Sequence, residues 1–207
     1  MPKKSKRRNE GFTPEEMVLL LDKSREASPL VRISVLLSAY SGARLAEIVE
    51  ASTLDFEMKG DRLVFSIRED NRDAGQTVKT EESVPRFPLH SCVVEEVRAY
   101  LASIPENGPL FAQVTLRGKS GKRSENAGAQ INGWIQDVAG IEGKTFHYFR
   151  HTWKSAMRNF IPAEDVRDYI TGHANGSVGR AYGRFPIATL ARAMESVPAD
   201  PMAWEIE

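Results

Sequence analysis

Four side chains suited to chemistry on a phosphate lie close together in the sequence, between Thr145 and Phe185. They are His147, Arg150, His173 and Tyr182. An arginine can hold two oxygens of one phosphate, an imidazole can donate a hydrogen bond or carry a proton, and a phenol can attack phosphorus. The set predicts a site for a reaction at a phosphate.

The spacing of these residues indicates which of them can share a site. His147 and Arg150 are three residues apart, so on a helix they lie on one face and can converge on one phosphate. Arg44 follows the turn Ser41-Gly42 and opens a helical pattern, where free backbone N–H groups attract anions. Two arginines could therefore clamp the non-bridging oxygens of one phosphodiester and stabilise the charge of its transition state.

The elements that must position these residues form a mostly helical α+β domain. A capping box with proline at the first helical position starts a helix at Thr13, and a second apolar run follows Pro29. Further helical patterns cover residues 44–49, 90–103, 125–138, 146–160, 163–171 and 187–197. Strand patterns over 62–68, 76–80 and 83–89 predict a small three-stranded antiparallel sheet, with the last strand at an edge because it contains two prolines.

Length and composition predict one compact domain. The chain has 207 residues, 41% of them hydrophobic, and its 28 basic and 28 acidic residues cancel, so net charge gives no argument for a nucleic-acid partner. A single cysteine excludes an intramolecular disulfide, and the sequence has neither a signal-peptide pattern nor a long apolar segment. We therefore expect an intracellular protein. The basic run Lys3–Arg8 fits either a solvated tail or a contact with a DNA backbone.

Five boxes, in order along the chain, resemble the tyrosine recombinase (phage integrase) family over nearly the whole sequence. Tyr40-Ser-Gly-Ala-Arg44-Leu-Ala-Glu47 resembles the first arginine box, and Val78-Lys79-Thr80 resembles the hairpin that carries the family's lysine. The others are His147-Tyr-Phe-Arg150, Thr171-Gly-His173 and Ala181-Tyr182-Gly183, which resemble the HxxR box, the glycine-histidine box and the nucleophile.

The resemblance implies a site-specific DNA recombinase or integrase that cleaves and rejoins double-stranded DNA through a 3′-phosphotyrosine, without metal, ATP or other cofactor. Its catalytic residues would be Arg44, Lys79, His147, Arg150, His173 and Tyr182, with Glu47 in support. The same resemblance implies a homo-oligomer, a tetramer, on DNA. It places the protein in the cytoplasm of a bacterium or phage-infected cell, associated with the nucleoid.

Two other tyrosines compete with Tyr182 by residue type. Tyr148 follows His147 directly and so points off the shared helix face, and Tyr169 lies in an apolar pattern with Val166 and Ile170. His151 is interpreted as an ordinary half-buried histidine. Tyr182 therefore remains the candidate nucleophile.

The resemblance also implies a helical core-binding domain before the catalytic domain, which is absent from this chain. We expect residues 1–12 to form a basic disordered tail, residues 13–207 to form the catalytic domain, and the chain to be an excised domain. The segment after Tyr182, from Pro186 to Val197 and Trp204, could pack on its own chain or dock on a neighbouring protomer.

Three alternatives remain. The first is a catalytically silent DNA-binding or assembly module on the same fold, although all six catalytic residue types are present. The second is a metal-dependent hydrolase using His147, His151 and His173, against which the HExxH glutamate is absent. The third is a nicking-closing enzyme like the type IB topoisomerases, which shares the chemistry and differs in lacking strand exchange.

Overall fold

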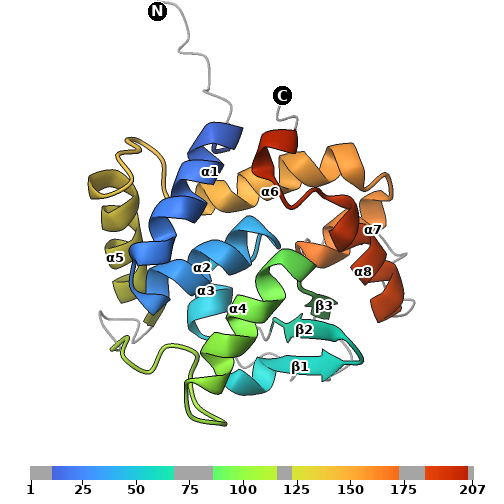
Figure 1. Cartoon of the computed structure of the whole chain (residues 1–207), viewed down its shortest axis with the longest axis horizontal. Coiled ribbons are helices and arrows are strands. Elements are labelled where there is room, and N and C mark those ends of the chain that lie inside the picture. The colour runs from blue at the N-terminus through green and yellow to red at the C-terminus, as the bar shows by residue number, and fades with distance from the viewer. Residues whose placement is uncertain (1–10, 68–85, 116–122, 173–184, 205–207) are drawn as a thin grey trace, which may run out of the picture.

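The computed structural model describes residues 11–67, 86–115, 123–172 and 185–204. These residues form a mostly helical body with a small sheet at one side (Figure 1). The α-helices are α1 (Pro14–Lys23), α2 (Pro29–Ala39), α3 (Leu45–Val49), α4 (Ser91–Ala102), α5 (Arg123–Asp137), α6 (His147–Phe160), α7 (Glu164–Ile170) and α8 (Ile187–Ser196). The strands are β1 (Phe56–Lys59), β2 (Arg62–Ser66) and β3 (Arg86–Pro88), and short 3₁₀ helices cover Ser24–Glu26, Thr53–Asp55 and Pro201–Ala203 (η5).

The helices begin where local capping signals predict them. At α1 the Thr13 hydroxyl accepts the N–H of Glu16 at 3.2 Å, and the Glu16 carboxylate accepts the N–H of Thr13 at 2.7 Å, with Pro14 at the first helical position. The predicted helices over 90–103, 125–138, 146–160, 163–171 and 187–197 are confirmed to within two residues at each end.

The sheet is antiparallel, in the order β1-β2-β3, and this confirms the predicted fold class. Its first strand was not predicted, because β1 is largely exposed and lacks a buried apolar face. Phe56 of β1 stacks on Phe65 of β2 at 4.6 Å between ring centroids. The predicted strand 76–80 lies outside the described residues, and the described part of the third predicted strand is β3, at the edge of the described sheet.

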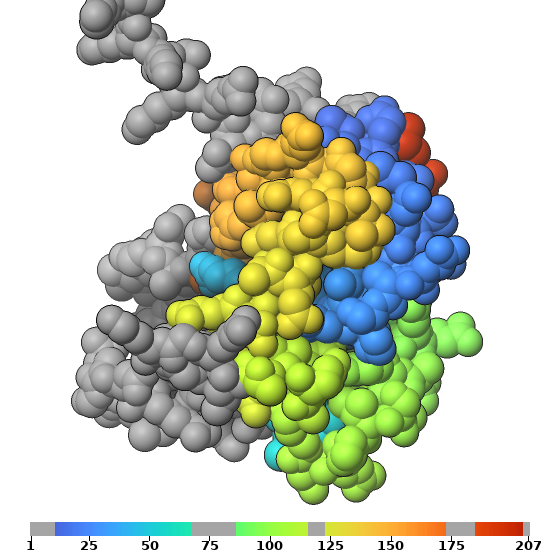
Figure 2. Space-filling model, turned by 90° about the vertical axis from the view of Figure 1, so that its left-hand side faces the viewer, coloured from blue at the N-terminus to red at the C-terminus, as the bar shows by residue number. Residues whose placement is uncertain are grey.

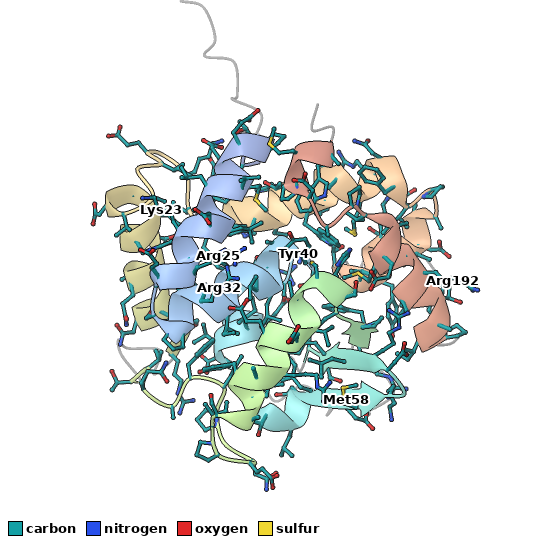
Figure 3. All side chains as sticks on the ribbon, viewed as in Figure 1. Lys23, Arg25, Arg32, Tyr40, Met58 and Arg192 are labelled. Carbon is teal, nitrogen blue, oxygen red and sulfur yellow. The ribbon has the colours of Figure 1, made fainter. Side chains whose placement is uncertain are left out.

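An aromatic cluster joins the C-terminal segment to the central helices. Tyr40, in the middle of the molecule (Figure 3), donates its hydroxyl to the Ala199 carbonyl at 2.6 Å. The Tyr40 ring meets those of Trp153 and Trp204 at 6.5 and 5.9 Å, and Trp204 donates to the Pro198 carbonyl. In this chain the segment after α8 therefore packs on its own protomer, and η5 lies beside α1 (Figure 1).

Glu195 fixes α8 against α4. Its carboxylate oxygens accept the backbone N–H of Ser91 at 2.8 Å and the Ser91 hydroxyl at 2.7 Å, at the first residue of α4. Arg62 of β2 donates to the same carboxylate at 3.2 Å. One side chain of α8 thus binds a helix residue 104 positions earlier and a strand residue 133 positions earlier.

The folded domain begins no later than Gly11. Residues 1–10 of the predicted tail lie outside the described residues, whereas Phe12 is fully buried and its N–H donates to the Thr152 hydroxyl of α6 at 2.6 Å. A Cβ added at Gly11 would lie 2.3 Å from the Thr152 hydroxyl oxygen and 2.7 Å from the Thr152 backbone nitrogen. The chain approaches α6 so closely here that only glycine fits.

We expect Gly11→Ala to lower the free energy of unfolding by about 1–3 kcal/mol, because the added methyl group overlaps a rigid helix backbone. Urea denaturation of the whole chain measures this. The matched control is Gly133→Ala within α5, where the nearest side-chain atom is 3.8 Å away, and it should raise stability by about 0.5–1 kcal/mol through helix propensity. Equal stability of Gly11→Ala and the parent would mean that Gly11 does not pack on α6.

Candidate active site

Arg44 is held at the first turn of α3 by Glu47. The Glu47 carboxylate accepts the backbone N–H of Arg44 at 2.6 Å and its guanidinium Nη1 at 2.5 Å. The side chain of Arg44 is still 43% exposed, so its remaining donors can reach a ligand. The sequence placed Arg44 after a turn and at a helix start, and the structure confirms that position.

The turn before Arg44 is built against α6. Gly42 has φ of 66°, and a Cβ there would lie 2.8 Å from the indole Cδ1 of Trp153. Any other residue would be strained by both the backbone conformation and the contact. The Gly42 carbonyl accepts Nη1 of Arg150 at 2.7 Å, which joins the turn carrying Arg44 to the helix carrying Arg150.

Arg150 is a buried cation, with 4% of its surface exposed. In addition to the Gly42 carbonyl, it donates Nη2 to the carbonyl of Thr171, at the end of α7. Burial, with a smaller contribution from Arg44, lowers the pKa of Arg150 to about 10, while Glu47 opposes the shift. Arg150 therefore keeps its charge at neutral pH, in a setting where a charge is costly unless hydrogen bonds and an anion compensate it.

His147 is the first residue of α6 and lies on the same side as Arg150. Burial, followed by the charges of Arg150 and Arg44, lowers the pKa of His147 below its ordinary value of 6.5. At neutral pH the imidazole is therefore uncharged and keeps one nitrogen free to accept a proton.

These three side chains line one cleft of about 180 Å³. It lies where the α2–α3 turn meets α5 and the start of α6, and Figure 2 shows α5 (yellow) and α6 (orange) as neighbours on this side of the molecule. The lining residues are Ala43, Arg44, Leu45, Asn132, Thr145, Phe146, His147 and Arg150. A larger hollow of about 560 Å³ between α4 and the β1–β2 turn contains none of the predicted site residues.

The other three predicted catalytic residues, Lys79, His173 and Tyr182, lie outside the described residues. The chain on either side of His173 and Tyr182 is described. Thr171 holds Arg150 through its carbonyl, and Phe185 packs on Tyr169 of α7 at 5.3 Å between ring centroids. The described residues on both sides of that segment therefore lie at α7: Thr171 ends the helix, and Phe185 packs on it.

Two residues near the cleft were not singled out from the sequence. Asn132 of α5 lines the cleft and accepts the N–H of Phe146 at 2.9 Å, which fixes the start of α6. Lys154 lies one turn after Arg150, and burial, followed by the charge of Arg150, lowers its pKa. No local motif marks either residue, because the hydrogen bond of Asn132 and the burial of Lys154 arise only in the folded chain.

Within the described ranges, no three histidine, cysteine, aspartate or glutamate side chains are grouped as a metal site requires. His173, the third member of the histidine set considered from the sequence, lies outside those ranges. None of the described helices combines the length and the apolar character needed to cross a bilayer.

No protein-family model matches the sequence, and no curated protein matches it. Solved structures, in contrast, include proteins whose fold is similar to that of this chain. An integrase from mycobacterium phage Brujita matches with a TM-score of 0.70 and 18% identity, over 100% of this chain and 63% of that chain. XerA recombinase matches with a TM-score of 0.61 and 17% identity, over 97% and 64%.

A third structure, the Tn1549 transposon integrase in complex with circular intermediate DNA, matches with a TM-score of 0.60 and 14% identity, over 93% of this chain and 66% of that chain. The chain thus spans slightly less than two thirds of each of these three structures. The helices and the three-stranded antiparallel sheet of this chain superpose on these structures. The chain therefore has the fold of a tyrosine recombinase catalytic domain.

Proposed function

We propose that this chain is the catalytic domain of a site-specific DNA recombinase that cleaves and rejoins double-stranded DNA through a 3′-phosphotyrosine. The observation that carries the proposal is the convergence of Arg44, Arg150 and His147 in one cleft. Two arginines held by a carboxylate and by backbone carbonyls form a fixed cation pair, which matches the two non-bridging oxygens of a phosphodiester.

The arginine pair would act mainly on the transition state. Attack on a phosphodiester increases the negative charge on its non-bridging oxygens, so fixed cations bind the phosphorane more tightly than the substrate. Burial, and after it the nearby charge of Arg44, lowers the pKa of Arg150, as expected for two like charges that repel each other. A phosphate between them relieves this repulsion, and the gain is largest when its charge is largest.

The chemical step would use Tyr182 as the nucleophile. The Tyr182 oxygen forms a bond to phosphorus as its phenolic proton passes to neutral His147. The bond from phosphorus to the 5′ oxygen breaks, and that oxygen takes a proton from Lys79, while His173 donates a hydrogen bond to a non-bridging oxygen. Reversal by the 5′ hydroxyl of a second DNA end would rejoin the strand without metal or ATP.

Covalent geometry favours a nucleophile from the same protomer. Tyr182 precedes Phe185 by three residues, so even an extended chain keeps their Cα atoms within about 11 Å. Phe185 packs on Tyr169, two residues before the Thr171 carbonyl that binds Arg150. The described residues on either side of the Tyr182 segment therefore contact α7 or continue from it, and the carbonyl of Thr171 at the end of α7 accepts a hydrogen bond from Arg150.

The biological setting follows from the same proposal. One of the similar structures is a DNA complex, and the partner proposed here is double-stranded DNA. Exchange of strands between two sites requires several copies, so we propose a homo-oligomer, a tetramer, on DNA. Its location would be the cytoplasm of a bacterium or phage-infected cell, on the nucleoid.

Tyr182→Phe should abolish covalent attachment of DNA, because phenylalanine lacks the attacking oxygen. A pool of nicked suicide duplexes with randomised centres, incubated in EDTA, traps the covalent product, and mass spectrometry identifies the modified tryptic peptide. The matched control is Tyr169→Phe, which keeps the ring that packs on Phe185 and should retain attachment. Attachment that persists in Tyr182→Phe would refute this nucleophile. Transfer of the trapped strand to a second duplex would distinguish a recombinase from a nicking-closing enzyme.

Arg44→Ala should lower the cleavage rate by about 10²–10³-fold and raise the Kd for DNA by less than about tenfold, because its largest contribution is to the transition state. Single-turnover cleavage and a binding titration at one salt concentration give the two quantities. Arg150→Ala should behave similarly, with its folding checked first, because Arg150 also binds two carbonyls. If the cleavage rate and the affinity for DNA fell by the same factor, the arginines would contribute to DNA binding alone.

The cleavage rate should fall as the pH drops through the pKa of His147, because protonation removes the acceptor for the Tyr182 proton. Since that pKa lies below its ordinary value, the rate should be level near neutral pH and fall in mildly acidic buffer. His147→Gln should be slower and lose this dependence. A wild-type rate that stays level with falling pH for as long as the protein remains folded would contradict a proton-accepting role for His147.

A further inference from the structure

The imidazole of His147 packs against a second imidazole. The rings of His147 and His151 lie 4.8 Å apart between centroids, with an angle of 84° between their planes. The two residues are four apart on α6, so successive turns of the helix bring them together. Edge-to-face packing at this distance is one of the two favourable arrangements of aromatic rings.

This contact is the end of a continuous line of rings. His151 also meets the ring of Tyr148 at 6.1 Å and 76°. Tyr148 in turn meets Phe12 at 5.9 Å, and Phe12 meets Phe149 at 4.8 Å. The line therefore runs from the buried Phe12 to His147, which lines the cleft.

The far end of this line is firmly anchored. Phe12 is fully buried and donates its N–H to Thr152 at 2.6 Å. Lys144 lies 5.6 Å above the Phe12 ring, donates to the Gly11 carbonyl at 2.9 Å and pairs with Glu16 at 2.5 Å. A ring line fixed in this way can limit the rotation of the imidazole at its other end.

We propose that His151 is a positioning residue, whose ring holds the imidazole of His147 in the orientation needed to receive the Tyr182 proton. The proposal rests on the proposed function only for the role of His147 as acceptor of the Tyr182 proton. The packing itself is a property of the free protein.

The charges around the two rings explain why an imidazole suits position 151. Among the described residues, the lasting charges that act on the two rings are cations: Arg150 and Arg44 act on His147, and Lys154 and Arg150 act on His151. Burial, followed by these charges, lowers the pKa of both histidines, and both rings are neutral at pH 7. An uncharged His151 does not oppose the imidazolium that forms on His147, whereas a lysine or arginine there would.

The positioning is tested by NMR of the whole chain without DNA, using labelled histidine. The sequence has 4 histidines, so single substitutions assign each signal. His151→Ala should increase the fast motion of the His147 ring and raise the pKa of His147, because the ring that shields it from water is gone. His151→Phe keeps a ring of similar shape and should preserve both properties. Arg158→Ala, exposed on the same helix, is the control and should change neither.

Two results would overturn the proposal. Unchanged motion and pKa of His147 in His151→Ala would show that His151 does not hold the ring. The same changes in His151→Phe as in His151→Ala would show that the imidazole nitrogens, rather than the packing, are responsible.

A cleavage assay separates this proposal from the proposed function. We expect His151→Ala to slow single-turnover cleavage about tenfold, and His151→Phe to stay within about twofold of wild type, with unchanged DNA affinity. Equal rates for wild type and His151→Ala would overturn the positioning role. If the wild-type chain cleaves no duplex in the pool, the proposed function fails, while the NMR result still decides whether His151 positions His147.

Discussion

The geometry of the candidate site depends on the hydrogen bonds of one buried guanidinium. Arg150 leaves water almost completely and donates to the carbonyls of Gly42 and Thr171, which lie 129 residues apart in the sequence. Removing an arginine from water costs several kcal/mol, which its hydrogen bonds and neighbouring charges must offset. A buried cation fixed in this way is most useful where an anion binds.

The same hydrogen bonds connect the described segments that flank the proposed catalytic residues. Through Gly42, Arg150 fixes the turn that presents Arg44, and through Thr171 it fixes the point where the chain enters the segment of His173 and Tyr182. A shift of α6 would consequently move both arginines together. Catalysis by oriented charges requires this kind of stiffness, because a displacement of about 1 Å can cost a large factor in rate.

Most of the fold could be predicted from local sequence signals. The features that could not be predicted depend on contacts between residues far apart in the sequence. The start of α1 and the position of Arg44 follow from capping and turn residues that are neighbours in the chain. The strand β1 was missed because it buries almost no side chain, and so it has no periodic apolar face. The burial of Arg150 was also hidden, because its partners are backbone carbonyls and any residue could supply them. The four-residue spacing of His147 and His151 on a helix predicts that their rings are neighbours. The spacing alone does not predict whether the rings pack together or are both exposed to solvent.

The packing of the C-terminal segment bears on the site although it lies away from the cleft. Trp204 packs on Trp153 at 5.8 Å, and Trp153 in turn lies against Gly42, whose carbonyl binds Arg150. The residues that follow Tyr182 therefore help to fix the turn that carries Arg44. Because interiors are close-packed, a change at Trp204 would be transmitted through Trp153 rather than absorbed by empty space. This packing would couple the seating of the C-terminal segment to the spacing of Arg44 and Arg150, and any partner that displaced that segment would act on the proposed phosphate site without touching it.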